Sequence, residues 1–417
     1  MKRLSILILT IIFVEFILPV DSQAIPAFAR KYGFNCNMCH VAFTKLNDFG
    51  QRYRDNGYQI PGQEGKENNV VGIAPPIAMR LSFGYSTYFN DVASTSTFGI
   101  YGFDLLSAGV LHKNISFLLI YTPRVDEPND SYSGVSLSGS QRGALESVSL
   151  IFSNLIPNAV NIRVGRFEPA YHVFSSKRSF YLFEPYEIYT LTNSNSTYIF
   201  DDNQIGIEAT GHFPIGFKYG VGLVNGTGIH SDNNVNKDIY VNVTQTFGKG
   251  EGQSAGQQIG AFIYYGWQPL DLPGTVISPS GETNGGDNKP FYRLGGTGSL
   301  NWKTMNLRVM YLMGVDDKAL NNLSPDEDYK YSGGFAELDY AGLMNNRLIA
   351  SLLYNWVTPP SYDSVRQVMA YSALLRYYFG DWTAVNVAIH AEYTHRETGK
   401  DTKYKENLVA LALDFDF

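Results

Sequence analysis

Beyond residue 76 the chain is dominated by short runs in which apolar and polar residues alternate. In the first run every odd position from Met79 to Tyr85 is apolar, and the even positions, beginning with Arg80, are polar or small. A period of two is typical of a β-strand with one apolar face. An arginine on the lipid side at mid-bilayer would cost about 2–4 kcal/mol, so we expect Arg80 to point inward. The run therefore predicts a strand whose apolar face meets lipid.

The same alternation recurs in later runs. Val160 and Val164 are expected to face outward and Arg163 inward. Near the end of the chain, His390 falls on the inward face of another such run. The last run alternates apolar residues with small or acidic ones and ends in an aromatic residue, Phe417. This ending resembles the insertion signal of bacterial outer-membrane barrels.

Period-two runs of this kind predict about sixteen strands. They lie near residues 77–89, 97–109, 114–123, 143–154, 159–167, 203–211, 216–225, 238–247, 257–267, 291–302, 305–315, 331–341, 346–356, 367–379, 384–395 and 405–417. The number is even, as closure with both chain ends on one side requires. Short connections alternate with long ones, which are 124–142, 168–202, 268–290 and 316–330. We therefore predict an all-β fold, an antiparallel outer-membrane β-barrel of about 16 strands formed by residues 77–417.

The connection 168–202 is rich in Phe and Tyr. It is long enough to fold inward as a constriction loop, to cap the mouth of the barrel or to rest on its rim. The connections also carry carboxylates, among them Glu184, Glu187 and the acidic run from Asp316 to Asp328. Carboxylate oxygens attract hard divalent cations, although solvated loop charge explains each residue taken singly.

The composition suits a barrel and excludes some functions. The 417 residues contain 32 Lys and Arg against 39 Asp and Glu, so no basic field points to nucleic acid. Charged residues make up 17%, which is low for a soluble surface, whereas 29 Tyr, 26 Phe and 40 Gly suit strands with aromatic girdles. After residue 24 no apolar run reaches the ~20 residues of a membrane helix.

Residues 1–24 have the pattern of a secretory signal peptide. Lys2 and Arg3 precede an apolar run that ends at Val20, and the small residues before and at Ala24 match a cleavage site. A retained anchor helix is the alternative. Export agrees with the predicted location in a bacterial outer membrane.

Both cysteines of the chain lie in the motif Cys36-x-x-Cys39-His40. This spacing is the signature of covalent c-type haem attachment, in which two thioethers hold the porphyrin and the histidine reaches the iron. Because positions i, i+3 and i+4 share one face of a helix, we expect these three side chains to point the same way. A thioredoxin-like pair, half a zinc site or a structural disulfide would use the same cysteines, but no βαβ pattern surrounds them and the next histidine is His112. The motif predicts one covalently bound haem c with His40 as the proximal iron ligand.

Residues 25–62 form the predicted monohaem cytochrome c segment, which we expect to be short and α-helical. An apolar stripe at near-helical spacing comprises Phe43, Leu46, Phe49 and Tyr53. Asn56-Gly57 then predicts the end of the haem-bearing helix. A segment of this length cannot build a hydrophobic core alone. The haem or the wall of another domain must therefore supply the missing apolar partner. The polar residues 63–76 predict a linker to the barrel.

The sixth iron ligand stays open at this stage. Met38 is held between the cysteines and cannot reach the other face of the porphyrin, and the segment contains no other Met or His except His40. If the segment plugs the barrel lumen, His390 could approach the iron as a distal ligand, but a lone inward histidine is more often a pore-lining group. A weak or absent distal ligand is the other alternative, with the reduction potential set by burial and hydrogen bonds.

A resemblance to a known family rests on residues 24–30, Gly33, the Cys36-x-x-Cys39-His40 motif, Leu46, Phe49-Gly50 and Asn56-Gly57-Tyr58. These residues are similar to those of the outer-membrane fused monohaem cytochrome-porin family of the iron-oxidation type. The resemblance implies electron transfer from an extracellular reduced metal such as Fe(II), through one haem, to a periplasmic soluble cytochrome or other carrier. In that sense it implies an iron oxidase, and the sequence carries no hydrolase or transferase signature.

The alternative function is an outer-membrane diffusion porin. In that case the cytochrome segment would be a redox-sensitive plug or gate. With either function we expect the barrel in membrane lipid and the N-terminal haem segment in the periplasm or the barrel lumen.

Overall fold

The computed structural model describes residues 27–42, 44–66, 77–123, 144–183, 185–193, 196, 198–228, 230–248, 256–270, 288–380 and 387–416. The predicted signal peptide, Phe43 of the predicted stripe and residues 67–76 of the predicted linker lie outside them. No helix within these ranges is both long and apolar enough to span a membrane.

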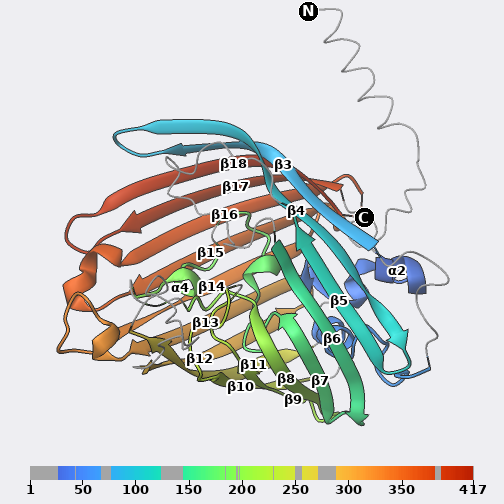
Figure 1. Cartoon of the computed structure of the whole chain (residues 1–417). Coiled ribbons are helices and arrows are strands. Elements are labelled where there is room, and N and C mark those ends of the chain that lie inside the picture. The colour runs from blue at the N-terminus through green and yellow to red at the C-terminus, as the bar shows by residue number, and fades with distance from the viewer. Residues whose placement is uncertain are drawn as a thin grey trace, which may run out of the picture.

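Sixteen antiparallel strands close into one barrel, as predicted (Figure 1). Each strand pairs with its neighbour in sequence, and the last strand pairs with the first to close the barrel. The strands are β3 (Ile77–Phe89), β4 (Ser94–His112), β5 (Ile115–Thr122), β6 (Ala144–Ile156), β7 (Val160–Phe167), β8 (Gln204–His212), β9 (Phe217–Val224), β10 (Asp238–Phe247), β11 (Gln257–Pro269), β12 (Asn288–Trp302), β13 (Met305–Asp316), β14 (Tyr329–Leu343), β15 (Leu348–Thr358), β16 (Val368–Tyr378), β17 (Val387–Thr398) and β18 (Tyr404–Asp416).

The two faces of the barrel wall follow the predicted phase. On the outer face Phe83 and Leu411 are 47% and 55% exposed, whereas Ala410, the residue before Leu411, is buried on the inner face. Arg163 and His390 are also buried inside, as the alternation predicts. Because many large apolar side chains of the strands are exposed on this face, the outer surface suits the hydrocarbon region of a bilayer.

The two ends of the barrel differ in the length of their connections, which confirms the predicted alternation. At one end the strands are joined by tight turns, in which Lys113, Asn158 and Lys303 take positive φ values of 47°, 60° and 53°. Left-handed backbone of this kind lets a very short turn match the twist of two antiparallel strands. We call this the short-turn end, and the opposite end, which includes residues 168–203, the long-loop end.

The N-terminal segment lies at the short-turn end. Asp48 makes an ion pair with Lys218 near the start of β9 and accepts a hydrogen bond from Thr246 (3.4 Å) near the end of β10. Nearby, Asn161 on β7 donates to the side chain of Asn56 (3.2 Å). In Figure 1 the segment (dark blue) begins with α2 beside the start of β3. The elements of the segment are α2 (Ala27–Tyr32), η1 (Cys36–Met38), β1 (His40–Ala42), β2 (Lys45–Leu46) and α3 (Asp48–Asp55).

The predicted single haem-bearing helix is wrong, because a hairpin separates the cysteines from the helix that follows. Helix η1 is one 3-10 turn that ends at Met38 with Cys39 as its C-cap, and the backbone N–H of Asn47 donates to the carbonyl of Cys39 (2.9 Å). The Asn47 side chain caps α3 by accepting from the N–H of Gly50 (2.9 Å). A Cβ at Gly50 would lie 2.2 Å from the Cys39 carbonyl oxygen, so only glycine permits this close approach. The predicted stop is confirmed, since α3 ends at Asp55.

The connection between β7 and β8 folds into the lumen, which decides between the predicted placements. It contains η3 (Ser176–Arg178) and α4 (Glu187–Thr190), and Figure 1 shows α4 inside the ring of strands. Tyr186 stacks on the inward side chain of Phe335 with ring centroids 3.8 Å apart, and Tyr171 meets Tyr240 edge-on at 5.0 Å. One continuous buried apolar cluster joins this loop to inward residues of strands β10 to β16 and also includes Cys36. The lumen beside the loop is therefore filled by packed side chains.

Candidate functional site

Buried ion pairs fix the N-terminal segment between opposite walls of the barrel. The ammonium of Lys45 on β2 lies 2.7 Å from Glu337 and 2.5 Å from Asp339, and all three side chains are at most 1% exposed. On the other side of the segment, Asp55 lies 2.8 Å from His212 and 3.4 Å from Arg163. These contacts join β2 to β14 and α3 to β7 and β8.

A cavity of about 330 Å³ lies between the segment and the barrel wall, and Cys36, Cys39 and His40 all line it. The hairpin after Cys39 has not separated the three motif residues, because η1 and the start of β1 both border the same space. Aromatic rings of the segment surround them. They are Phe28, Tyr32, Phe34, Tyr53 and Tyr58. Phe28 stacks on Tyr58 with ring centroids 4.9 Å apart, so the rings pack against one another as well as against the cavity.

The facing barrel wall is apolar where the lumen of a porin would be polar. Leu106 pairs with Ile120, and Ala108 pairs with Leu118, in the register of β4 and β5. All four residues line the cavity. A water-filled lumen favours polar side chains at inward positions, so this patch indicates an apolar occupant of the cavity. We call these four residues the apolar wall patch.

Further along the same cavity the lining becomes charged. Arg80 lies 3.7 Å from Asp104, Lys177 lies 3.7 Å from Glu146, and Arg178 lies 2.5 Å from Glu168. Arg80 faces inward, as predicted, and also donates to the backbone carbonyl of Lys177 (3.1 Å). The cavity is therefore amphipathic, with apolar and charged residues in its lining.

Burial controls the protonation of the motif residues. Burial lowers the pKa of His40 to about 4. Hydrogen bonds with the backbone of Thr44 and Lys45 favour the charged ring, but their effect on the pKa is smaller than that of burial. Burial, together with the neighbouring Cys36, raises the pKa of the Cys39 thiol to about 12. At neutral pH His40 is thus an uncharged imidazole, the form that binds metals. The two cysteines are not bonded to each other.

The structure does not bring His390 to this cavity. His390 is fully buried on β17, where Nε2 lies 3.1 Å from Glu392 and Nδ1 lies 3.4 Å from Asp414. It is not among the residues that line the cavity at His40. Its role as a distal ligand stays a prediction, and the two carboxylates give the imidazole a structural role in the wall.

The acidic connections do not form a cation site in the described part of the chain. No group of three or more His, Cys, Asp or Glu side chains there is arranged to hold a metal ion. Asp316 is fully buried and pairs with Arg293 at 2.6 Å, and the side chain of Asp317 accepts from the N–H of Ala319 (2.8 Å). Glu187 pairs with Arg396 at 2.9 Å, and Glu184 lies outside the described residues.

Sequence reasoning missed the apolar wall patch and the charged residues beyond it. The signal for the patch is present, because Leu105 and Leu106 are consecutive and the polar phase of β4 is lost there. Such a run has an apolar residue on both faces of the strand. The pairing of Arg80, Lys177 and Arg178 with their acids depends on contacts distant in sequence, so the sequence gives no signal for it.

The closed antiparallel barrel, its apolar exterior and its alternating turns and loops define the fold of outer-membrane porins. The anion-selective porin from Comamonas acidovorans has this fold, with a TM-score of 0.56 at 13% identity over 82% of this chain and 99% of that one. The outer membrane channel DcaP of Acinetobacter baumannii gives 0.54 at 10% identity over 84% and 99% of the two chains. OprB of Pseudomonas putida gives 0.52 at 13% identity over 82% and 94%. No protein-family model matches the sequence, and no curated protein sequence matches it.

These similarities support the porin part of the predicted fold and a barrel in contact with outer-membrane lipid. They concern the fold alone, because the identities are low.

Proposed function

We propose that this protein is an outer-membrane cytochrome-porin that carries one covalently bound haem c in the cavity beside Cys36, Cys39 and His40. The observation that supports the proposal best is the apolar wall patch, which faces the motif across a cavity of about 330 Å³. A covalently tethered macrocycle would bury this patch and the aromatic rings of the segment. The haem would thereby supply the apolar core that so short a segment lacks.

Each motif residue has a defined role in this proposal. Cys36 and Cys39 would hold the haem through thioethers, and His40 would be the proximal iron ligand. The haem, when bound, supplies one-electron redox chemistry. The neutral state of His40 leaves an imidazole nitrogen available for a metal, and its hydrogen bonds to the hairpin backbone orient the ring.

The position of the segment supports an electron partner on the periplasmic side. The short-turn end of an outer-membrane barrel faces the periplasm, and the long loops face outside. We infer that an extracellular donor such as Fe(II) gives up its electron on the long-loop side, and that a periplasmic soluble cytochrome or other carrier collects it at the short-turn end. Because oxidised iron precipitates, a cell gains by leaving that product outside.

The packed lumen supports electron transfer over solute diffusion. The loop between β7 and β8 joins the inward face of β10 to β16 in one apolar cluster. The ion pairs of Lys45 and Asp55 fix the segment between the walls. A hydrophilic solute would have to displace both, whereas an electron need not displace either.

The second candidate is a diffusion porin in which the segment is a redox-sensitive plug or gate. The observation in its favour is the fold shared with porins. This candidate requires the segment to leave the lumen, which would expose Glu337 and Asp339 without their ammonium partner.

Absorbance spectroscopy and conductance of the purified protein distinguish the two. We expect a c-type α-band that persists after denaturation, is lost when both cysteines are replaced by alanine, and rises when Fe(II) is added. A haem that stays oxidised under excess Fe(II) would contradict iron oxidation. Large single-channel conductance in planar bilayers would contradict the packed lumen and favour the diffusion porin.

A further inference from the structure

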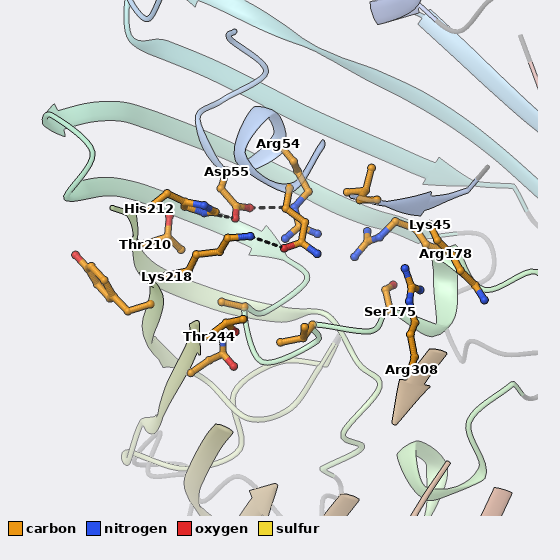
Figure 2. A pocket seen from close by; sticks show the side chains of 16 residues that line it. Lys45, Arg54, Asp55, Ser175, Arg178, Thr210, His212, Lys218, Thr244 and Arg308 are labelled. Atoms are coloured by element: carbon orange, nitrogen blue, oxygen red, sulfur yellow. Dashed lines mark hydrogen bonds and ion pairs between the residues drawn. The ribbon is translucent and has the colours of Figure 1, made fainter. Parts of the chain in front are cut away.

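A second, smaller cavity of about 50 Å³ lies inside the barrel, beside β2 and α3 of the N-terminal segment (Figure 2). It is lined by residues of β2 and α3, by the loop between β7 and β8, and by inward residues of β8, β9, β10 and β13. Only Leu46, Arg54 and Arg178 also line the larger cavity, so the two spaces are neighbours.

The lining of this cavity is mainly cationic. Its five lysines and arginines are Lys45, Arg54, Arg178, Lys218 and Arg308, and its only carboxylate is Asp55. Asp55 is already engaged by His212 and Arg163. Four of the five cations have acids in contact: Glu337 and Asp339 for Lys45, Asp55 and Glu168 for Arg54, Glu168 for Arg178, and Asp48 for Lys218.

Arg308 is the exception among these described residues. It is 7% exposed, and its guanidinium makes no ion pair within 4 Å and no hydrogen bond with the described part of the chain. The ring of Phe174 lies 5.3 Å from the guanidinium carbon. Glu337 lies opposite Arg308 in the register of β13 and β14 and attracts it from beyond ion-pair distance. The carboxylate of Glu337 instead binds Lys45 and accepts from the hydroxyl of Tyr186 (2.9 Å).

A second buried polar group points into the same space. Ser175 is 5% exposed, and its hydroxyl has no hydrogen-bond partner in the described chain. Figure 2 shows Ser175, Arg308, Arg178 and Lys45 gathered around one part of the cavity. Two unsatisfied groups of this kind rarely share a buried cavity unless something there binds both.

We propose that this cavity is a binding site for one small inorganic anion, which accepts from the guanidinium of Arg308 and the hydroxyl of Ser175. An anion would give the Arg308 guanidinium and the Ser175 hydroxyl the hydrogen-bond acceptor that the described chain does not supply. The site has room for a halide or a small oxyanion. It does not depend on the haem proposed for the neighbouring cavity.

Thermal unfolding of the purified protein in detergent tests this proposal. We expect sodium bromide or sodium phosphate, or both, to raise the unfolding temperature saturably, and sodium gluconate at the same ionic strength to lack this effect because gluconate exceeds the cavity. Arg308→Met keeps the apolar stem over Phe174 and should abolish the saturable rise. Arg347→Met removes an exposed arginine from a short turn and should preserve it.

Two further measurements keep the test decisive if Arg308→Met does not fold. Ser175→Ala should weaken the saturation at least several-fold. Crystals grown with the stabilising salt should show its anion beside Arg308, as an anomalous peak for bromide or as tetrahedral density for phosphate. Equal stabilisation by all three salts, or a cavity that holds only water in both bromide and phosphate, would overturn the proposal.

Discussion

At the residue scale, the fixed position of the N-terminal segment depends on a few buried charges. Lys45 makes ion pairs with Glu337 and Asp339 of β14, and neither acid has another cation within 4 Å in the described chain. A buried charge that loses its partner is far more costly than one on the surface. The segment is thus fixed by side chains that the alternation of the barrel strands does not predict.

We expect Lys45→Met to destabilise the protein by about 3–5 kcal/mol, because Glu337 and Asp339 are left as unpaired buried carboxylates. Denaturant unfolding of the purified protein measures this change. The matched control is Lys330→Met, since the Lys330 side chain is 67% exposed, and its effect should stay within about 0.5 kcal/mol. Equal effects of the two substitutions would show that the Lys45 pairs do not stabilise the fold.

His172 predicts a pH dependence in the loop that fills the lumen. Burial lowers the pKa of His172 to about 4, although Glu168 nearby favours the charged ring. Between pH 6.5 and about 4 the unfolded chain therefore binds a proton that the folded chain does not, so stability falls as the pH falls. The slope should reach about 1.4 kcal/mol per pH unit. His172→Gln keeps a donor for the Phe200 carbonyl and should remove this part of the slope in unfolding measured from pH 7 to pH 4.5.

At the element scale, β4 and β5 show that one pair of strands can serve two environments. Their outer faces meet lipid as in the rest of the barrel, while their inner faces carry the apolar wall patch. Leu118 faces the cavity, and the next residue, Leu119, faces outward and is 36% exposed. Neighbouring leucines thus test the inner and outer faces separately.

We expect Leu118→Gln to reduce the haem bound per folded barrel, because it places a polar group against the proposed macrocycle. Leu119→Gln puts the same side chain towards lipid and should leave the haem content of folded protein unchanged, even if it lowers the yield. The measurement is haem absorbance divided by folded protein after purification. Equal haem content in both variants would contradict the role of the apolar wall patch.

The sequence predicts the barrel strands well and the interior poorly, for a physical reason. Lipid outside and polar groups inside impose a period of two on each strand, so local alternation reveals phase and number. The hairpin that interrupts the expected helix depends on the hydrogen bond between Asn47 and Cys39, and the inward loop depends on Phe335, far away in sequence. Asp316 likewise makes an ion pair with Arg293 on the neighbouring strand β12 and does not form part of a cation site. Such contacts leave no periodic pattern.

At the scale of the whole molecule, the barrel combines the wall of a porin with a packed interior. The N-terminal segment lies inside the barrel at the short-turn end, and the loop between β7 and β8 fills the lumen beside it. This combination suits a protein that moves electrons while keeping solutes apart. The proposed haem would lie on the periplasmic side of that barrier.

Electron transfer across a sealed membrane tests this account most directly. The purified protein is inserted into lipid vesicles that enclose oxidised soluble cytochrome c, and Fe(II) is added outside. We predict reduction of the enclosed cytochrome at a rate that falls to the level of empty vesicles when Cys36 and Cys39 are both replaced by alanine. An enclosed cytochrome that stays oxidised with haem-loaded wild-type protein, or one reduced equally by the double variant, would contradict the proposed function.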